Sequence, residues 1–328
     1  MRQAAAGIPV IALGRIGTPH LADEVIATGQ GDLVGASRAQ IADAAFANKA
    51  ADGRSDDIRP STFNNFCWGE VHAGKPLAEF HNPELATEGA AHAKPKVTQN
   101  LKRVAIIGAG PAGLEAAWVA AARGHQVTLY GASKRAGGKL ALEALLPGHA
   151  SMDQVTAFQM HQARQYGVEF KLGQMMDEGA IKALVADVLI LATGAIPRVP
   201  QITLDDSIAL YSVHGIALAL SANNLPKGHT AVVFDHDHTA PTYAAALALT
   251  GCFQRVIVAT PRTHIAQAVN YCSALGIHRR LDEAEVEVLT GIEPISGNNK
   301  QLHLRHVFSR RTRVIDEVST LVYSTPRQ

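Results

Sequence analysis

The sequence has few cysteines, few aromatic residues and almost no net charge, and each shortage excludes a class of protein. Its three cysteines, Cys67, Cys252 and Cys272, are too few and too far apart for a disulfide framework, which favours a reducing, cytoplasmic setting. A net charge of +1 and an aromatic content of 5% argue against nucleic acid as a partner. No apolar run reaches the roughly 18 residues that span a bilayer, so we expect no membrane association.

The chain is nevertheless apolar enough to build sizeable cores. It has 328 residues, of which 47% are hydrophobic, and this length is typical of about two domains. Short apolar runs alternate with helical patterns, which predicts an α/β protein with parallel sheets. Residues 1–50 contain two strand–helix units, and Thr18 and Pro19 are the expected N-cap and first residue of the first helix. Residues 51–100 form a polar connector with a concentration of aromatic side chains.

The strongest motif is VAIIGAGPAGLEAA at residues 104–117. A strand precedes it, a helix follows it, and a second strand comes about 20 residues later, which is the context of a dinucleotide-binding loop. Gly108 would allow the tight turn, Gly110 the approach of a pyrophosphate, and Gly113 the close packing of helix on strand. The alternative is a tight turn that binds no ligand. Gly131 stands where an acidic residue usually holds the ribose hydroxyls, so we expect either reduced adenosine affinity or another group in this role.

A second α/β unit begins near Lys227, and its first strand runs into DHDHTA at residues 235–240. The three glycine positions of a phosphate loop are occupied there by two aspartates and an alanine. Because Asp235 and Asp237 would repel a pyrophosphate, we do not expect NAD(P)H binding in this unit. A metal site is one interpretation of the alternating Asp and His. We favour a polar loop in which Asp237 or Thr239 caps the following helix, because no further cluster of ligands is evident.

Longer segments resemble known flavoproteins. Four segments resemble the FAD-binding half of two-dinucleotide flavoprotein reductases. They are GAGPAGLEAAWVAAARGHQVTLY (108–130), AGGKL (136–140), LPG (146–148) and VLILATGAIPR (188–198). Three earlier segments resemble the last two βα units of an old-yellow-enzyme-type flavin barrel. They are IPVIALGRI (8–16), GDLVGASRAQIAD (31–43) and DGRSDDIRP (52–60). In this order the segments resemble the NADH:flavin oxidoreductases of the 2,4-dienoyl-CoA reductase and trimethylamine dehydrogenase type. Because the loop at residues 235–240 lacks the phosphate-loop glycines, the sequence resembles the amine dehydrogenase and demethylase branch more than the dienoyl-CoA reductases.

The resemblance implies two groups of cofactor-binding residues, and it assigns no catalytic residue. FAD or ADP would be bound by Gly108, Ala109, Gly110, Pro111, Ala112, Gly113, Gly137, Gly138, Lys139, Thr193 and Gly194. The phosphate of FMN would be bound by Gly14, Arg15, Ser37 and Arg38. These four follow the two N-terminal strands, and the loops after strands 7 and 8 of a (β/α)₈ barrel are its usual phosphate site. The alternative for the two arginines is an ordinary surface position.

Three features depart from the family pattern. A complete barrel takes about 250 residues, and fewer than 60 precede the connector, so we expect either a fragment of a longer protein or a remnant that packs in some other way. The places of four cluster-binding cysteines hold Ser61, Asn64, Cys67 and Phe80, so we expect no iron–sulfur cluster. Because the sequence stops soon after VSTLVY at 318–323, the resemblance implies that the last flavin-contacting segment of such proteins is missing, and we expect FAD to be held less tightly.

Together these features predict a Rossmann-like FAD/NAD(P)-binding domain at 101–225 and 300–328 with an inserted α/β unit at 226–299. A barrel remnant at 1–50 and the connector at 51–100 would precede it. The expected function is that of the C-terminal portion of a flavin-dependent oxidoreductase, with FAD or ADP here and FMN in the complete barrel. A small molecule, such as an N-methylated amine, is the expected substrate, and an electron-transfer protein the expected partner. The alternatives are a structural ADP-binding module that docks such a partner, or an inactive gene fragment.

Overall fold

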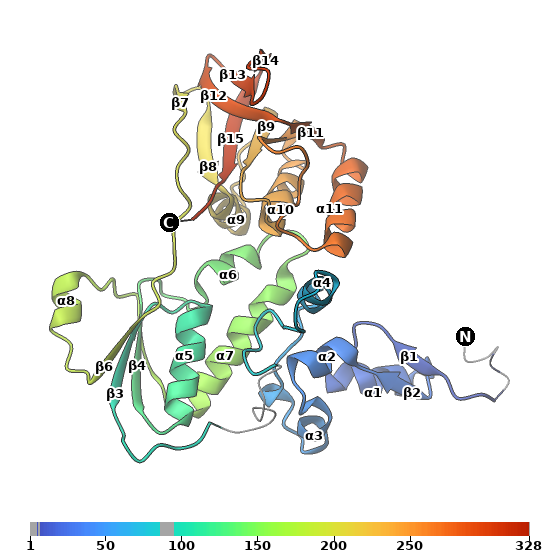
Figure 1. Ribbon diagram of the computed structural model, residues 1–328, viewed down its shortest axis with the longest axis vertical. Coiled ribbons are helices and arrows are strands. Elements are labelled where there is room, and N and C mark those ends of the chain that lie inside the picture. The colour runs from blue at the N-terminus through green and yellow to red at the C-terminus, as the bar shows by residue number, and fades with distance from the viewer. Residues whose placement is uncertain (1–4, 6, 86–94, 328) are drawn as a thin grey trace. The chain divides into compact units, whose positions relative to one another are not determined.

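The computed structural model describes residues 5, 7–85 and 95–327 of the chain, and it contains two compact units (Figure 1). The first unit comprises residues 1–138 and 153–193, and the second residues 139–152 and 194–328. Each contains helices and a parallel sheet, so the predicted α/β fold class is confirmed. No helix in the described part of the chain is long and apolar enough to cross a membrane.

The N-terminal segment contains two strand–helix units and a short third helix. Its elements are β1 (Ile11–Leu13), α1 (Pro19–Ala27), β2 (Leu33–Gly35), α2 (Ser37–Ala42) and α3 (Phe46–Ala51). The strands β1 and β2 pair in parallel. The Thr18 hydroxyl accepts a hydrogen bond from the Leu21 amide at 3.2 Å, which confirms the predicted N-cap of α1. Two strands cannot cover their own apolar side chains, and Leu13 is 73% exposed.

The connector contains more regular structure than its composition predicts. It includes the 3₁₀ turn η2 (Ser55–Asp57) and α4 (Phe66–His72), a helix that the sequence analysis did not predict. Between them in the sequence lies Arg59, which is buried and donates to Glu115 at 2.8 Å. The rings of Trp118 and Phe158 lie 5.7 and 4.8 Å from the same guanidinium. One buried cation therefore fixes the connector to the rest of the first unit.

The main sheet of the first unit has four parallel strands in the order β5-β4-β3-β6. Its elements are β3 (Arg103–Ile107), α5 (Pro111–Ala122), β4 (Gln126–Gly131), α7 (Asp153–Gln165), β5 (Glu169–Leu172), α8 (Glu178–Lys182) and β6 (Val188–Leu191). Alternate residues of β3 serve the two faces. Val104 and Ile106 pack in the cluster that includes α5 and α7, whereas Ala105 and Ile107 pack with residues around α8 (Figure 1).

The second unit has three layers, because a parallel sheet lies between helices and a second sheet. The parallel sheet and its helices are β8 (Ala209–Ser212), α9 (Val213–Ser221), β9 (Gly228–Asp235), α10 (Ala240–Leu249), β10 (Phe253–Thr260), α11 (Tyr271–Glu283), β11 (Glu287–Thr290) and β15 (Val318–Ser324). The strand order is β11-β10-β9-β15-β8. The other sheet contains β7 (Thr203–Leu204), β12 (Ile292–Asn298), β13 (Gln301–His306) and β14 (Thr312–Ile315). Residues 139–152 add η3 (Ala150–Met152) and most of α6 (Gly138–Glu143).

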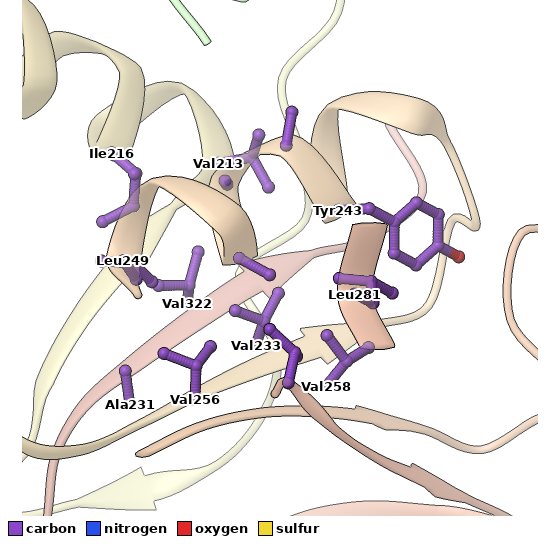
Figure 2. Packing of buried hydrophobic residues seen from close by; sticks show 14 of the residues in the cluster. Val213, Ile216, Ala231, Val233, Tyr243, Leu249, Val256, Val258, Leu281 and Val322 are labelled. Carbon is purple, nitrogen blue, oxygen red and sulfur yellow. The ribbon is translucent and has the colours of Figure 1, made fainter. Parts of the chain in front are cut away.

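The larger core of the second unit lies between the parallel sheet and α9, α10 and α11 (Figure 2). Val233 of β9 packs there with Tyr243 and Leu249 of α10. The neighbouring Val232 points to the other face and packs with Leu302 of β13. Alternate residues of β9 therefore build both cores, as in a strand that is buried on both sides.

The observed units differ from the predicted domain boundaries. The prediction assigned residues 194–225 and 300–328 to the first domain, but β8 pairs with β15, and β15 pairs with β9, in the second sheet. The physical reason lies in β15, where Leu321 and Val322 are fully buried in the cores on opposite faces. Such a strand belongs in the middle of a covered parallel sheet.

Candidate dinucleotide-binding site

Two of the three motif glycines are required by close packing inside the β3–α5 loop. Gly108 has a φ of 115°, and a Cβ there would lie 2.1 Å from the Ala192 carbonyl oxygen, just after β6. A Cβ on Gly113 would lie 1.8 Å from the Gly108 carbonyl oxygen. Neither position has room for a side chain. The fold alone therefore accounts for both glycines, without reference to a ligand.

Gly110 is different, because nothing in the fold requires a glycine there. Its backbone is extended, with φ −83° and ψ −178°, and the nearest atom to an added Cβ would be the Gly138 Cα at 4.0 Å. It is the N-cap of α5, and no side chain caps that helix. Pro111 and Ala112 form the beginning of the first turn. The uncapped start of a 12-residue helix therefore adjoins open space, which is a favourable setting for a phosphate group.

The second glycine pair, Gly137 and Gly138, lies against this loop. The Gly137 amide donates to the Ala109 carbonyl oxygen at 2.7 Å, and a Cβ on Gly138 would lie 3.0 Å from the Gly110 Cα. Both glycines have positive φ angles, 113° and 55°. The structure thus brings the predicted segments 108–113 and 137–138 together.

Of the other predicted cofactor residues, Thr193 belongs to the first unit, whereas Lys139 and Gly194 belong to the second. The Lys139 Nζ atom is buried and has no hydrogen-bond partner among the described residues. Burial lowers the pKa of this ammonium, and the charge of Arg327 lowers it further. Because a buried cation without a partner is costly, Lys139 is suited to an anionic group of a ligand.

The structure gives a reason for the missing acidic residue at the end of β4. A Cβ on Gly131 would lie 2.8 Å from the Leu172 Cδ2 atom and 2.9 Å from the Ala109 Cβ atom. Apolar atoms therefore fill the space that a side chain at this position would need. The reduced adenosine affinity expected from the lack of a carboxylate stays a prediction.

Two residues that the sequence analysis did not single out support the loop. Gln159 of α7 donates from Nε2 to the Pro111 carbonyl oxygen at 3.1 Å and to Glu115 Oε2 at 2.8 Å. Glu115 also accepts the hydrogen bond from Arg59. These contacts hold the first turns of α5. Arg59 and Gln159 lie 56 and 44 residues from Glu115 in the sequence, so no local motif could have revealed them.

The residues predicted to bind an FMN phosphate are Gly14, Arg15, Ser37 and Arg38. In the structure the two arginines both lie near the Phe63 ring. Their guanidinium carbons lie 6.0 and 4.8 Å from the centre of the Phe63 ring. Arg38 also donates to Asn65 Oδ1 at 2.6 Å, so the connector already holds this side chain. Gly14 directly follows β1, and Ser37 is the first residue of α2.

The second unit has a small pocket beside the ends of β9 and β15, lined in part by Glu143, His214, Asp237 and Arg327. His214 and Arg327 contact Glu143 Oε1 at 3.3 and 3.1 Å. Burial opposes ionisation of Glu143, but these two partners hold its pKa below its usual value. Glu143 is therefore a paired carboxylate and not a free acid–base group. Within the described residues, no three His, Cys, Asp or Glu side chains are grouped to hold a metal ion.

Comparison with known protein families decides the relationship. The model of the family "Pyridine nucleotide-disulphide oxidoreductase" matches residues 102–325. The chain belongs to this family. Membership implies binding of a flavin and a pyridine nucleotide.

Individual relatives extend the likeness beyond the family domain. The "Probable N-methylproline demethylase" of Rhizobium meliloti (strain 1021) is 29% identical over 308 residues, which are 92% of this chain and 44% of the relative. The "NADH oxidase" of Thermoanaerobacter brockii is 37% identical over 197 residues, 60% of this chain and 30% of the relative. The solved 6-hydroxypseudooxynicotine amine oxidase of Pseudomonas geniculata N1 has a TM-score of 0.88 at 25% identity. The match covers 98% of this chain and 50% of that one.

The chain spans half or less of the length of each of these proteins. The resemblance to old-yellow-enzyme-like flavin oxidoreductases, including the amine-acting ones, is confirmed. The chain contains a domain of this oxidoreductase family and corresponds to part of longer proteins.

Proposed function

We propose that the chain is the C-terminal, dinucleotide-binding portion of a flavin-dependent oxidoreductase that oxidises a small amine. In this proposal the glycine loop after β3 binds the pyrophosphate of FAD or ADP. The observation that carries it is Gly110, the one motif glycine that the fold does not require. Approach of a ligand phosphate is the remaining reason for a glycine at that position. A bound flavin would supply the redox chemistry, and the residues of this chain would hold and orient it.

The substrate class rests on the names of two relatives. One is a probable N-methylproline demethylase and the other an amine oxidase, so an N-methylated amine is the substrate that we propose. Oxidation of an amine releases two electrons, which must leave the flavin for an acceptor. An electron-transfer protein is the partner that we propose for this step.

Exposed apolar side chains on β1 and β2 support a place in a larger flavin barrel. Ile11, Leu13 and Leu33 are 55%, 73% and 54% exposed, although they lie on paired parallel strands. Parallel strands are normally covered on both faces. Further strands and helices of a (β/α)₈ barrel would cover them and would carry FMN, with Arg15 and Arg38 near its phosphate.

An iron–sulfur cluster is not part of the proposal. Cys67 is buried in α4, and burial, with the nearby Glu79 carboxylate, raises the pKa of its thiol. A cluster needs several thiolates, and Ser61, Asn64 and Phe80 stand at the other expected positions. The few separated cysteines also support a reducing, cytoplasmic setting.

The alternative is a structural module that holds ADP and docks an electron-transfer partner. One observation favours it: Asp235 and Asp237 stand at the glycine positions of the loop after β9, so no pyridine nucleotide would deliver electrons to a flavin from that loop. Such a module would retain ADP and carry no flavin.

An absorbance spectrum of the purified chain, with mass spectrometry of the compound released on denaturation, separates the two functions. Visible flavin bands and released FAD are expected for the oxidoreductase portion. Released ADP without flavin would support the structural module. Release of neither compound, even after incubation with FAD and ADP, would contradict both.

The substitution Gly110→Asp tests the site itself. A carboxylate at this position should abolish retention of FAD or ADP, because it would repel the pyrophosphate. Gly251→Asp is the matched control, since Gly251 is exposed and an added Cβ would have no atom within 4 Å. Equal nucleotide content in Gly110→Asp and wild type would show that the loop is not the site.

A further inference from the structure

The loop between β9 and α10 has the topology of a phosphate loop and a different chemistry. Counted from the end of the apolar run in β9, the positions that hold the three glycines in a phosphate loop hold Asp235, Asp237 and Ala240 here. The family to which the chain belongs implies pyridine nucleotide binding, so these residues must be tested against that ligand.

Asp235 is built into the core of the second unit and cannot leave the turn. It has no exposed surface. Its Oδ2 atom accepts from the Tyr243 hydroxyl at 2.6 Å, and its Oδ1 atom accepts from the His238 amide at 2.9 Å. The Tyr243 hydroxyl in turn accepts from the Ala266 amide. Both carboxylate oxygens therefore have partners within the fold, and the turn contains a side chain where a phosphate loop has none.

Asp237 places its carboxylate at the start of α10. Its Oδ1 atom accepts from the Thr239 amide at 3.2 Å, from the Thr239 hydroxyl at 3.0 Å and from the Thr242 hydroxyl at 3.1 Å. Ser324, the last residue of β15, donates to the same atom at 2.7 Å. Thr239 is the N-cap of α10, but its own side chain makes no capping hydrogen bond. One backbone amide and three hydroxyls beside this helix start therefore donate to an anion that the chain itself supplies.

The position of Asp237 is the position of a ligand in this type of sheet. In open parallel sheets, ligands bind at the carboxyl ends of the strands where the strand order reverses. Here the order is β11-β10-β9-β15-β8, and the pocket beside the ends of β9 and β15 is lined by Asp237, Thr239 and Ser324. The pocket has a volume of about 10 Å³, which is space for roughly one water molecule and far less than the roughly 300–1,000 Å³ of small-molecule sites.

We propose that the Asp237 carboxylate occupies the anion position of this second loop, so that the unit is a nucleotide-type site closed by its own side chain. The residues do not fit a pyridine nucleotide, whose pyrophosphate would meet Asp237 at the helix start and Asp235 in the turn. Removing the Asp237 carboxylate should open an anion site that wild type lacks. The proposal concerns the second unit and does not depend on what the Gly108–Gly113 loop binds.

Hydrogen exchange resolved by peptide tests this, with inorganic pyrophosphate and NADH as probes. In wild type, neither probe should slow exchange in the peptide that covers residues 235–245. In Asp237→Gly, exchange at the start of α10 should rise about fivefold, because the Thr239 amide and the neighbouring hydroxyls lose the acceptor that they share. Millimolar pyrophosphate should return it toward the wild-type rate. Asp237→Ser is a second variant that retains a short capping oxygen and should also respond to pyrophosphate.

The control is Asp205→Gly. Asp205 accepts from the amides of Ser207 and Asn299 in a turn that does not begin a helix, so pyrophosphate should leave exchange there unchanged. Saturable protection of residues 235–245 by NADH in wild type would overturn the proposal. Failure of pyrophosphate to slow exchange in both folded Asp237 variants would overturn it as well. The peptide covering residues 104–116 is read in the same experiment, so failure of the first loop is seen separately.

Discussion

The β3–α5 and β9–α10 segments have the same order of strand, loop and helix, but their loops differ in chemistry. In the first, Gly110 leaves open space at the uncapped start of α5. In the second, Asp237 fills the corresponding place and collects donors from Thr239, Thr242 and Ser324 at the start of α10. Both helices pack on parallel sheets. The shared topology places the start of a helix beside a loop in both segments. The residue at one loop position then determines whether a ligand phosphate can bind there.

The first way to break the comparison is to fill the tightest point of the first loop. Gly113→Ala should destabilise the first unit by more than about 3 kcal/mol, because the new Cβ would lie 1.8 Å from a backbone oxygen. Chemical unfolding followed by circular dichroism measures the change. Ala240 stands at the same place in the second loop, and Ala240→Gly should have a much smaller effect. Equal effects of the two substitutions would contradict the packing argument.

The second concerns the buried cation that supports the first loop. Arg59→Ala should lower the free energy of unfolding by about 3 kcal/mol, because it leaves Glu115 without its buried partner. Arg54→Ala is the control, since Arg54 is paired with Asp52 at the surface, and such pairs contribute little. A change in Arg59→Ala as small as in the control would show that the connector does not hold α5.

The third concerns Asp235 in the second loop. Burial raises the pKa of this carboxyl to about 6, and the Asp237 charge adds to the shift, whereas the hydrogen bonds from Tyr243 and His238 oppose it. The folded state therefore favours the protonated form, whose contribution to stability is complete below the ordinary pKa of 3.8 and is lost as pH rises through 6. Between pH 4 and 7 this loss should be on the order of 2 kcal/mol.

The measurement is urea unfolding at several pH values in wild type and Asp235→Asn. The amide stays neutral, so the pH-dependent difference between the two proteins isolates this group. Asp206→Asn, at an exposed position, should leave the pH profile of wild type unchanged. A wild-type profile in Asp235→Asn would mean that Asp235 is ionised throughout.

The smallest effect on stability is expected at Gly110. Gly110→Ala should change the free energy of unfolding by less than about 1 kcal/mol, because the backbone is extended and the Cβ meets no close atom. It should nevertheless weaken nucleotide binding, because a methyl group occupies the approach to the phosphate. Thermal unfolding with and without ADP measures both. Large destabilisation without ligand would mean that the fold, and not a ligand, requires this glycine.

Sequence alone predicted those parts of the molecule in which neighbouring residues act together. The glycine loop and the Thr18 cap depend on spacings of a few residues, and the structure shows the packing at Gly108 and Gly113 that such spacing implies. The expected cap of α10 by Asp237 or Thr239 is wrong in detail, because neither side chain makes a capping hydrogen bond and Asp237 accepts from the amide of the N-cap residue instead.

The features that sequence missed depend on distant contacts or weak local patterns. The place of β15 follows from pairing with β8 and β9, about 90 or more residues earlier. The hydrogen bonds from Arg59 and Gln159 to Glu115 likewise join segments that are distant in the sequence. The helix α4 has no clear apolar stripe, since Phe66, Trp68 and Val71 are all partly exposed.

Native mass spectrometry of the chain with excess ADP and NADH tests the contrast between the two loops most directly, because it counts bound nucleotides. One adenine nucleotide is predicted per chain, absent in Gly110→Asp and retained in Asp237→Asn. Two nucleotides per wild-type chain, or one that survives Gly110→Asp and disappears in Asp237→Asn, would contradict the account.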